Sequence, residues 1–348
     1  RLISLPVSGQ RAFHGPPALA GVIVPGPHLD EGPNGFTLLH ASGALVRVST
    51  QPLRTLQGVV ADAAGRLWWI EAPQAPLDLW RLWRYDVNQG ELTFVLQETS
   101  VPFADGGAPR TPELVGLLSG DDGSFWLLLD TSQPQQQRTQ TGLYQVRLDG
   151  NALGEVRQIL PESSYRRPIR LSPDGSRLAH LAYDPQQASL TNGVLRPANQ
   201  LWVRPVGGAA PANNPATPAY VTETRFEFLA PQLAWQDNQR LILARSRFAP
   251  GDLFGLETFG LVQVGLEGPD VVSQSYLLPP GRRVEDFTVC QADGRLLVQE
   301  VNKEEGRRLA LWMGRGPLVP LVELPETVDR LLACWRAPDR PLQAQSAP

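Results

Sequence analysis

The hydrophobic pattern of this chain is a short apolar segment, a polar turn and a second apolar segment, repeated along its length. One copy covers 58–70 (GVVADAAGRLWWI) and another covers 115–129 (VGLLSGDDGSFWLLL). Further copies lie at 169–181, 232–243 and 287–298. Asp-Gly and Asn-containing turns between apolar runs predict β-hairpins, because these residues tolerate positive φ. The turns are 52 to 63 residues apart, which indicates a structural repeat.

A second predicted hairpin follows each first one. Its leading strand often reads Leu-Trp or Leu-Tyr, and a polar turn and a last strand complete the unit. The leading strands are expected at 82–87, 142–148, 200–204, 260–264 and 308–312. Helical periodicity is nearly absent, and the 33 prolines would interrupt helices. Four short antiparallel strands, repeated radially, predict an all-β fold built from β-propeller blades.

The two ends of the chain are expected to share one blade. Segment 327–335 has the spacing of a first strand, but only 13 residues follow Trp335, too few for three more strands. The N-terminal part supplies three apolar strands, at 19–24, 35–40 and 44–48. A blade made from both ends would close the ring and leave no open sheet edge. The sequence therefore predicts six blades.

We expect residues 1–348 to form one propeller domain, because a domain boundary inside the ring would open it. An N-terminal extension covers 1–18. The blades are predicted at 19–50 with 327–348, 54–98, 110–161, 166–223, 226–279 and 282–325. The resulting 58 residues per blade exceed the roughly 40–45 of compact WD-type blades, so several connections are long. This assigns the many glycines and prolines to turns and connections.

The segment 171–183 (LSPDGSRLAHLAY) resembles the repeat of TolB-type and related WD-type propellers, in which Ser-Pro-Asp-Gly forms the turn before an apolar strand. The resemblance is good in one blade, while the other five keep only the turn and the apolar pattern. It implies the propeller fold and an extracytoplasmic protein-binding module. The same repeat occurs in propellers attached to prolyl-oligopeptidase-like enzymes, which carry catalysis on a separate α/β-hydrolase domain. This chain has no Gly-x-Ser-x-Gly motif.

Charge and targeting signals narrow the classes of partner. The chain has 31 basic and 35 acidic residues and a net charge of −4, which argues against a nucleic-acid partner. No stretch approaches the ~20 apolar residues of a transmembrane helix. The chain starts at Arg1 without methionine, from which we expect a removed signal segment or a trimmed chain. The interpretation is a bacterial periplasmic or lipid-anchored protein.

The candidate binding residues are arginines. Of the 31 basic residues 30 are arginine, and in each predicted blade one falls in or beside the segment that leads into the innermost strand. They are Arg54, Arg110, Arg166, Arg167, Arg225, Arg282, Arg283 and Arg330. Acids lie close by at Glu113, Glu227, Glu285, Asp286 and Asp329. Such a ring would surround one mouth of the central channel and clamp a partner's peptide, since arginine pairs bidentately with carboxylates. The alternative is ordinary surface ion pairing in an arginine-rich chain.

The aromatic residues of 79–85 (LWRLWRY) allow two interpretations. On a strand Trp80 faces one side, and Trp83 and Tyr85 face the other. Packing between blades is favoured over an exposed Trp/Arg binding patch. The same core placement is expected for Trp68, Trp69, Trp126, Trp202, Trp235, Trp312 and Trp335.

Other candidate chemistry is sparse. The acid pairs Asp121–Asp122 and Glu285–Asp286 raise the question of metal or acid–base chemistry, but the first pair lies in a turn. Six-bladed lactonase-type propellers hold a divalent ion with Glu, Asn and Asp, and no such set is identified in this sequence. Neither a metal nor another cofactor is predicted. Cys290 and Cys334 occupy equivalent inner-strand positions, where thiols are favoured over a disulfide, which needs Cα atoms within ~7 Å.

These observations favour a non-catalytic exported propeller that acts as a protein-interaction module or scaffold. It would bind another protein or peptide through its channel mouth and long loops. One alternative is an enzyme of lactonase, cyclase or lyase type that uses the channel. Another is a structural subunit of a membrane-associated assembly. The sequence leaves the oligomeric state open.

Overall fold

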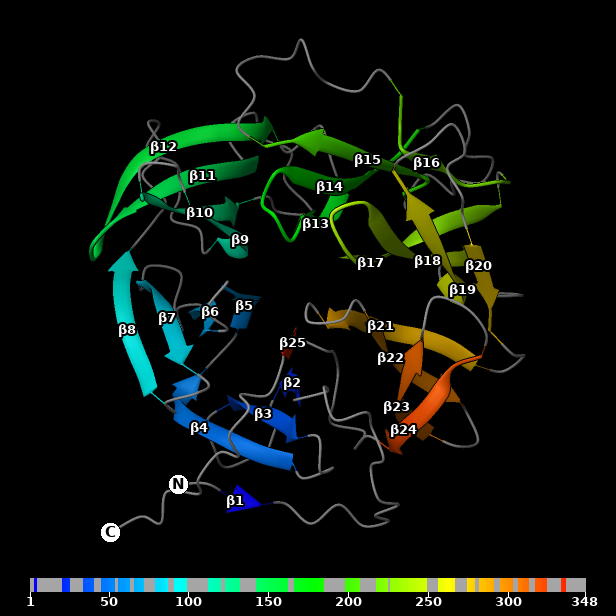
Figure 1. Ribbon diagram of the computed structural model, residues 1–348, viewed down its shortest axis with the longest axis horizontal. Coiled ribbons are helices and arrows are strands. Elements are labelled where there is room, and N and C mark those ends of the chain that lie inside the picture. Colours follow the sequence, from blue (N-terminus) through cyan, green and yellow to red (C-terminus); the bar gives the residue numbers. More distant parts are fainter. Residues whose placement is uncertain are drawn as a thin grey trace. The chain divides into compact units, whose positions relative to one another are not determined.

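The computed structural model of the chain is built from β-strands, and the part of the chain that it describes contains no helix (Figure 1). The described residues are 3–4, 21–25, 34–40, 45–53, 56–62, 66–71, 79–86, 91–98, 112–119, 123–131, 142–161, 166–184, 198–206, 217–224, 226–248, 256–266, 274–278, 282–290, 295–302, 306–312, 317–323 and 333–335. Two compact units make up the chain, Arg1–Ser163 with Thr327–Pro348, and Ser164–Glu326. Each unit is described by itself.

The first unit contains two four-stranded antiparallel sheets and the sheet that joins the chain's ends. One sheet has the order β5-β6-β7-β8, and the other has the order β12-β11-β10-β9. Their strands are β5 (Leu56–Ala61), β6 (Arg66–Glu71), β7 (Trp80–Asp86), β8 (Glu91–Glu98), β9 (Glu113–Ser119), β10 (Phe125–Asp130), β11 (Gly142–Asp149) and β12 (Ala152–Pro161).

The N- and C-terminal parts of the chain meet in one sheet of this unit. Its strands are β1 (Ile3–Ser4), β4 (Leu45–Leu53), β3 (Asn34–His40), β2 (Gly21–Pro25) and β25 (Ala333–Trp335), in this order. Strand β25 pairs antiparallel with β2, with Gly21 opposite Trp335 and Val22 opposite Cys334. The expected pairing of the two ends is therefore confirmed.

The second unit contains three more four-stranded antiparallel groups, each in sequence order. The first is β13 (Arg166–Leu171), β14 (Arg177–Ala182), β15 (Gln200–Pro205) and β16 (Tyr220–Val221). The second is β17 (Glu227–Trp235), β18 (Arg240–Phe248), β19 (Leu256–Gly265) and β20 (Gln274–Leu277). The third is β21 (Arg282–Cys290), β22 (Arg295–Asn302), β23 (Gly306–Trp312) and β24 (Val319–Glu323).

The first strands of neighbouring groups contact one another within each unit, and some second and third strands, such as β19 against β21, add to these contacts. In the first unit β5 contacts both β9 and β25, and in the second unit β17 contacts both β13 and β21. Four antiparallel strands with the first strand innermost are the arrangement of a propeller blade. The all-β propeller fold is confirmed, with five complete four-stranded blades among the described residues. The single-domain interpretation remains a prediction.

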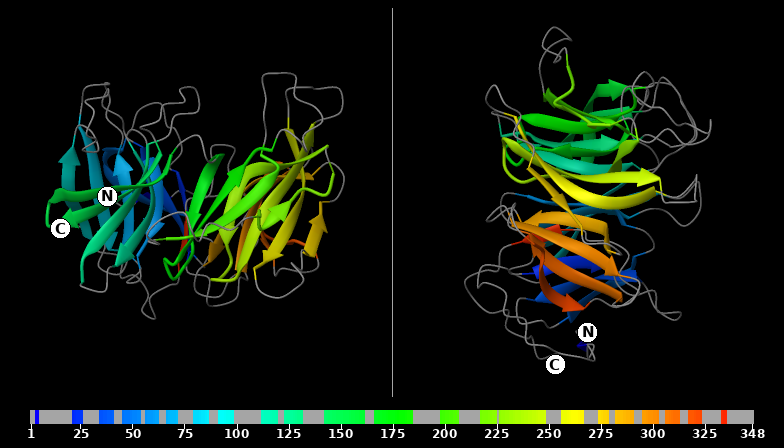
Figure 2. Two further views of the ribbon diagram at one scale, coloured as in Figure 1. Left: turned by 90° about the horizontal axis from the view of Figure 1, so that it is seen from above. Right: turned by 90° about the vertical axis from the view of Figure 1, so that its right-hand side faces the viewer.

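Both faces of the blades are apolar, so neighbouring sheets pack face to face within each unit (Figure 2). In β6 every residue from Leu67 to Glu71 is buried. One core cluster joins β6 and β7 to β10 and β11, where the rings of Trp68 and Phe125 lie 5.2 Å apart. Two further clusters join the three blades of the second unit. This two-sided burial explains the continuous apolar runs in the sequence.

The tryptophans confirm most of the expected core placement. Five of the seven named above are buried, namely Trp68, Trp69, Trp126, Trp235 and Trp312, while Trp202 is half-buried and the side chain of Trp335 lies outside the described residues. Trp80 is fully buried in the cluster that contains Trp68. Trp83 is half-buried on the other face, where it lies opposite Trp69 and makes an edge contact with Phe94. Tyr85 is buried.

An arginine follows the first turn of four blades, and in three of them the structure shows its role. Asp62 Oδ1 accepts the Arg66 backbone N–H at 2.9 Å, and Asp62 Oδ2 accepts Arg66 Nε at 2.7 Å. Asp237 holds the backbone N–H and Nε of Arg240 in the same way. In the third turn Ser172 Oγ accepts the Arg177 N–H at 2.9 Å, and Gly175 adopts a φ of 74°. These contacts close the hairpins that the sequence predicted.

The hydrogen bonds to Asp62 predict acid-sensitive stability. Burial alone would raise the pKa of Asp62, but bonds from Trp68 Nε1 and from Arg66 outweigh it and hold the pKa below its usual value. A lowered folded-state pKa adds stability above the unfolded pKa of ~3.9, and acidification through the folded pKa removes it. We expect Asp62→Asn to cost about 1 kcal/mol at neutral pH and to flatten the loss of stability below about pH 4. Denaturant unfolding at several pH values measures both effects.

The matched control is Glu155→Gln, which removes an exposed carboxylate that pairs with Arg157 two residues along the same strand, β12. It should leave the pH profile unchanged. If the free energy of unfolding fell with pH equally in the wild type and in Asp62→Asn, the carboxylate of Asp62 would not cause the loss of stability in acid.

Candidate functional site

The predicted arginines are only partly within the described residues. Arg54, Arg110, Arg225 and Arg330 lie outside them. The backbone of Arg166 and Arg167 opens β13, but their side chains lie outside the description. Arg282 and Arg283 open β21 and are described in full. The candidate site therefore rests on one blade, β21–β24, and its neighbour in the same unit.

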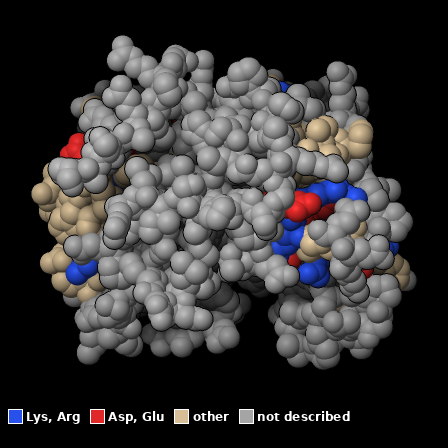
Figure 3. Space-filling model, turned by 90° about the horizontal axis from the view of Figure 1, so that it is seen from below, with Lys and Arg blue, Asp and Glu red and all other residues tan. Residues whose placement is uncertain are grey.

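Two carboxylates, each shared by two arginines, form the centre of this site. We call the six residues the arginine–glutamate network, and they are Arg282, Arg283, Glu285, Glu300, Arg307 and Arg308. They come from the start of β21, the end of β22 and the start of β23. In Figure 3 basic and acidic side chains lie side by side on the side where Figure 1 draws β21–β24.

Glu300 is the buried carboxylate of the network, with only 1% of its side chain exposed. Its Oε2 accepts Arg308 Nε at 2.7 Å, and Arg282 Nη1 lies 3.3 Å from both carboxylate oxygens. Arg308 lies directly opposite Glu300 on the neighbouring strand. A buried charge is tolerated when it is paired and hydrogen-bonded in this way. Arg282 therefore fills a structural position.

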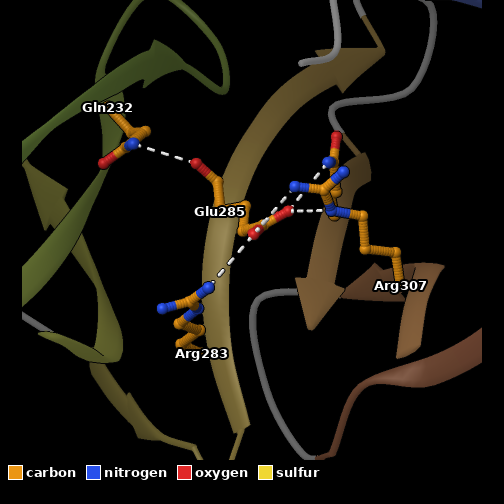
Figure 4. A network of polar contacts seen from close by, with 5 residues as sticks. Gln232, Arg283, Glu285 and Arg307 are labelled. Atoms are coloured by element: carbon orange, nitrogen blue, oxygen red, sulfur yellow. Dashed lines mark hydrogen bonds and ion pairs between the residues drawn. The ribbon is translucent and has the colours of Figure 1, made fainter. Parts of the chain in front are cut away.

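Glu285 is the second shared carboxylate, and Figure 4 shows its contacts. Arg307 Nε donates to Glu285 Oε2 at 2.7 Å, and Gln299 Nε2 donates to the same oxygen at 3.1 Å. Arg283 Nη2 lies farther away, 3.4 Å from Glu285 Oε1. The Glu285 backbone carbonyl accepts Gln232 Nε2 from β17 at 3.0 Å, which ties the two inner strands together.

A bulge in β21 and the alternation of side chains along the strand together set which face each charged residue of β21 occupies. The pairing of β21 with β22 shifts between Val284 and Asp286, so that Glu285 has no directly paired residue. Val284 packs into the core shared with the blade β17–β20. Strand alternation places Arg282 on the face of Val284 and Arg283 on the opposite face. Adjacent arginines thus contact different carboxylates.

A related cluster lies on the neighbouring blade. Arg245 is buried and donates to Glu227 Oε2 at 2.6 Å, while Glu223 lies at 3.5 Å. Burial acts to lower the pKa of Arg245, but the hydrogen bond and charge of Glu227 outweigh it and raise the pKa. The guanidinium also lies 5.2 Å from the centre of the Phe259 ring. The expected acid Glu227 is therefore an internal partner of a buried arginine.

Sequence reasoning missed Glu300 and its counterpart Glu71 in the first unit. Glu71 is buried, accepts Trp83 Nε1 at 2.7 Å and lies 3.9 Å from Arg81. The signal was present, because both glutamates follow the post-turn arginine by five residues and both lie opposite an arginine on the third strand. The pattern is recognisable only when cross-strand register is known.

The remaining sequence candidates are described only in part. Asp121 and Asp122 lie outside the described residues. Asp286 accepts its neighbour's N–H, from Phe287, at 2.8 Å. In the described ranges no group of three or more His, Cys, Asp or Glu side chains could hold a metal ion. The same ranges contain no helix long and apolar enough to span a membrane.

Glu113 and the two cysteines complete the set of sequence candidates. Glu113 begins β9 and is half-buried. Cys290 lies on β21 and Cys334 on β25, with side chains outside the described residues. Asp329 also lies outside. The thiol prediction for the two cysteines stays a prediction.

Comparison with known proteins supports the fold. The chain is similar to a chain of a nidogen/laminin complex, at 11% identity, with 91% of this chain and 98% of that chain covered and a TM-score of 0.51. It is also similar to an oligogalacturonate lyase of Vibrio parahaemolyticus (9%, 93% and 85%, TM-score 0.49). A third similar structure is a periplasmic gluconolactonase of Pseudomonas aeruginosa (14%, 87% and 82%, TM-score 0.45). No family model and no curated protein matches the chain.

Removal of the Glu300 carboxylate should destabilise the protein strongly. Glu300→Ala leaves Arg282 and Arg308 close together without their shared anion, and breaking a buried ion pair costs about 3–5 kcal/mol. The exposed control Glu155→Ala should cost less than about 0.5 kcal/mol. Thermal and denaturant unfolding give the comparison. Equal, small losses for both variants would contradict a structural role for Glu300.

His180 on β14 gives a second pH prediction. Burial lowers its pKa to about 4, and the charge of Arg204 acts in the same direction, against a hydrogen-bond contribution from the Leu181 carbonyl. The unfolded chain, with a pKa near 6.5, binds the proton first on acidification. The wild type should therefore lose up to about 3 kcal/mol between roughly pH 6.5 and pH 4. His180→Gln should lack this part of the dependence in denaturant titrations, and an unchanged slope would contradict the assignment.

Proposed function

We propose that the chain is a six-bladed propeller whose last blade is shared between its two ends. The pairing of β25 with β2 supports this closure, since it brings a C-terminal first strand to three N-terminal strands. Five blades of four strands account for the remainder of the described sequence. A closed ring protects sheet edges and places the starts of the inner strands around one channel mouth.

We propose further that the protein is a non-catalytic interaction module that binds another protein through this mouth. The observation that carries the proposal is Arg283, which is 58% exposed at the start of the inner strand β21, beside the arginine–glutamate network. The network holds the flanking side chains in place, and arginine is enriched at interaction hot spots. A rigid base with an exposed guanidinium lowers the entropic cost of binding.

The fold permits such a role. The similar chain with a TM-score of 0.51 comes from a nidogen/laminin complex, an assembly of two proteins. The TolB-type segment 171–183 supports the proposed extracytoplasmic location, in the periplasm or on a lipid anchor. The alternatives are a lactonase, cyclase or lyase that uses the channel, and a structural subunit of a membrane-associated assembly.

Site-specific photo-crosslinking in the native host tests the proposal. A photoreactive amino acid is introduced in place of Arg283, or in place of the comparably exposed Arg157 on β12 as the matched control. We expect one discrete heavier product from position 283 and none from position 157, because only the former would face the partner. Absence of a product at 283, or products at 157 alone, would contradict the proposed mouth.

A second arm addresses the enzyme alternative. The purified protein is analysed for divalent metal and assayed for lactone opening and for uronate lyase activity. A stoichiometric metal together with turnover would replace the binding module with a channel-site enzyme. A crosslinked product that co-sediments with a large membrane complex would instead favour the structural-subunit alternative.

A further inference from the structure

Arg282 and Arg283 are adjacent in the sequence but differ in how they are held. Arg282 contacts both oxygens of Glu300, the most deeply buried carboxylate of the arginine–glutamate network, and only 19% of its side chain is exposed. Arg283 has most of its side chain in solvent, and its contact with Glu285 is 3.4 Å long. Hydrogen bonds between charged groups are normally 2.7–2.9 Å long, and the contacts of both arginines are longer than this. Arg283 is the loosely held member because it has one such contact and a mostly exposed side chain, whereas Arg282 contacts two oxygens of a buried carboxylate.

Glu285 does not depend on Arg283 for its charge balance. Arg307 donates through Nε at 2.7 Å, and Gln299 donates to the same oxygen. Figure 4 shows Arg283 approaching the carboxylate from the side opposite Arg307. If Arg283 turned away, Glu285 would keep its two closest partners. The exchange of this internal carboxylate for an external one would therefore cost little.

The net charge of the arginine–glutamate network favours an anionic ligand. Glu285 carries one negative charge between two guanidiniums, and Glu300 does the same, so the six residues of the network have a net charge of +2 (four arginines, two glutamates). Among its described residues the blade contains two further acids, Asp286, which accepts the Phe287 N–H, and Glu323, which lies opposite Arg308 on strand β24.

We propose that Arg283 is the residue that binds the partner, that it takes a carboxylate of an acidic segment of that protein, and that Glu285 is the internal carboxylate this ligand displaces from Arg283. Arg282, in contrast, is a structural residue held by Glu300. This assignment rests on the proposed protein-binding function and adds the chemistry of the partner. It separates two arginines that the sequence had placed in one binding ring.

The test uses fluorescein-labelled hexaglutamate as the probe, with hexaglutamine as the neutral comparison, in anisotropy titrations at low ionic strength. Four full-length variants are compared with the wild type: Arg283→Gln, Glu285→Gln, Arg157→Gln and Glu155→Gln. The last two are matched controls, since Arg157 and Glu155 form an exposed pair at 2.6 Å and the side chain of Arg157 is about as exposed as that of Arg283. The charge changes are identical in the two pairs.

We expect Arg283→Gln to weaken hexaglutamate binding about two- to fivefold, the range of an exposed ion pair, and Glu285→Gln to strengthen it by a similar factor. The two controls should change it by less than these factors, and hexaglutamine should not bind. Added salt should reduce the differences, because the interaction is exposed. Arg283→Gln should melt like the wild type, whereas Arg282→Gln should lower the melting temperature.

If the variants at Arg157 and Glu155 changed the hexaglutamate affinity as much as those at Arg283 and Glu285, binding would reflect only the net charge of the protein. This result would overturn the assignment. Unchanged binding in Arg283→Gln would do the same. Stronger competition by inorganic phosphate than by free glutamate would replace the acidic segment with a phosphoryl ligand. If Glu285→Gln does not fold, the Arg283→Gln and Arg157→Gln pair still decides the result.

The experiments distinguish a wrong assignment of the acidic ligand from a wrong proposal of the protein-binding function. Crosslinking from position 283 without any preference for hexaglutamate would retain the interaction module and reject its acidic ligand. Hexaglutamate binding at Arg283 without a crosslinked protein would retain the anion site and reject the protein-binding function.

Discussion

The need to bury both faces of the sheets governs the part of this structure for which burial is described. Strands of the five complete blades contribute to apolar layers between neighbouring sheets, and a residue such as Trp80 or Leu127 is fully enclosed between two sheets. Burial of a large apolar side chain stabilises the fold by roughly 1.5–3 kcal/mol, so a row of such layers provides the main driving force. A polar side chain that is buried inside a strand needs a partner, as Arg245 has in Glu227.

Two sets of polar contacts lie at the ends of the strands. At one end the first hairpin turns are closed by aspartate or serine, as Asp62 closes its turn onto Arg66. At the other end shared carboxylates such as Glu300 fix the starts of the first and third strands. These ion pairs lie where the apolar layers stop, and they hold the surface that a partner would meet. Arg283 differs from the other arginines of the network because most of its side chain is exposed to solvent.

The sequence was sufficient for the repeat, because hairpin turns and two-sided apolar strands are local patterns. The four-strand unit, the joining of β2 with β25 and the burial of Trp69 and Trp312 were all predicted on this basis. The contacts of individual arginines were beyond it. They depend on cross-strand register and on the bulge between Val284 and Asp286, which no local pattern indicates. An arginine after four of the first turns was visible in the sequence, but the bonds of Arg66 to Asp62 and of Arg240 to Asp237 became clear only in three dimensions.

Hydrogen–deuterium exchange of the chain with its crosslinked partner tests the central claim most directly, namely that the strand-start end bearing the arginine–glutamate network is the binding surface. The amides that open β21 and β23 should exchange more slowly in the complex, because a bound partner would suppress local opening there. The strands β8 and β12, which lie at the outer edges of their sheets, should be unaffected. Protection confined to β8 or β12, with unchanged exchange at the starts of β21 and β23, would contradict the account.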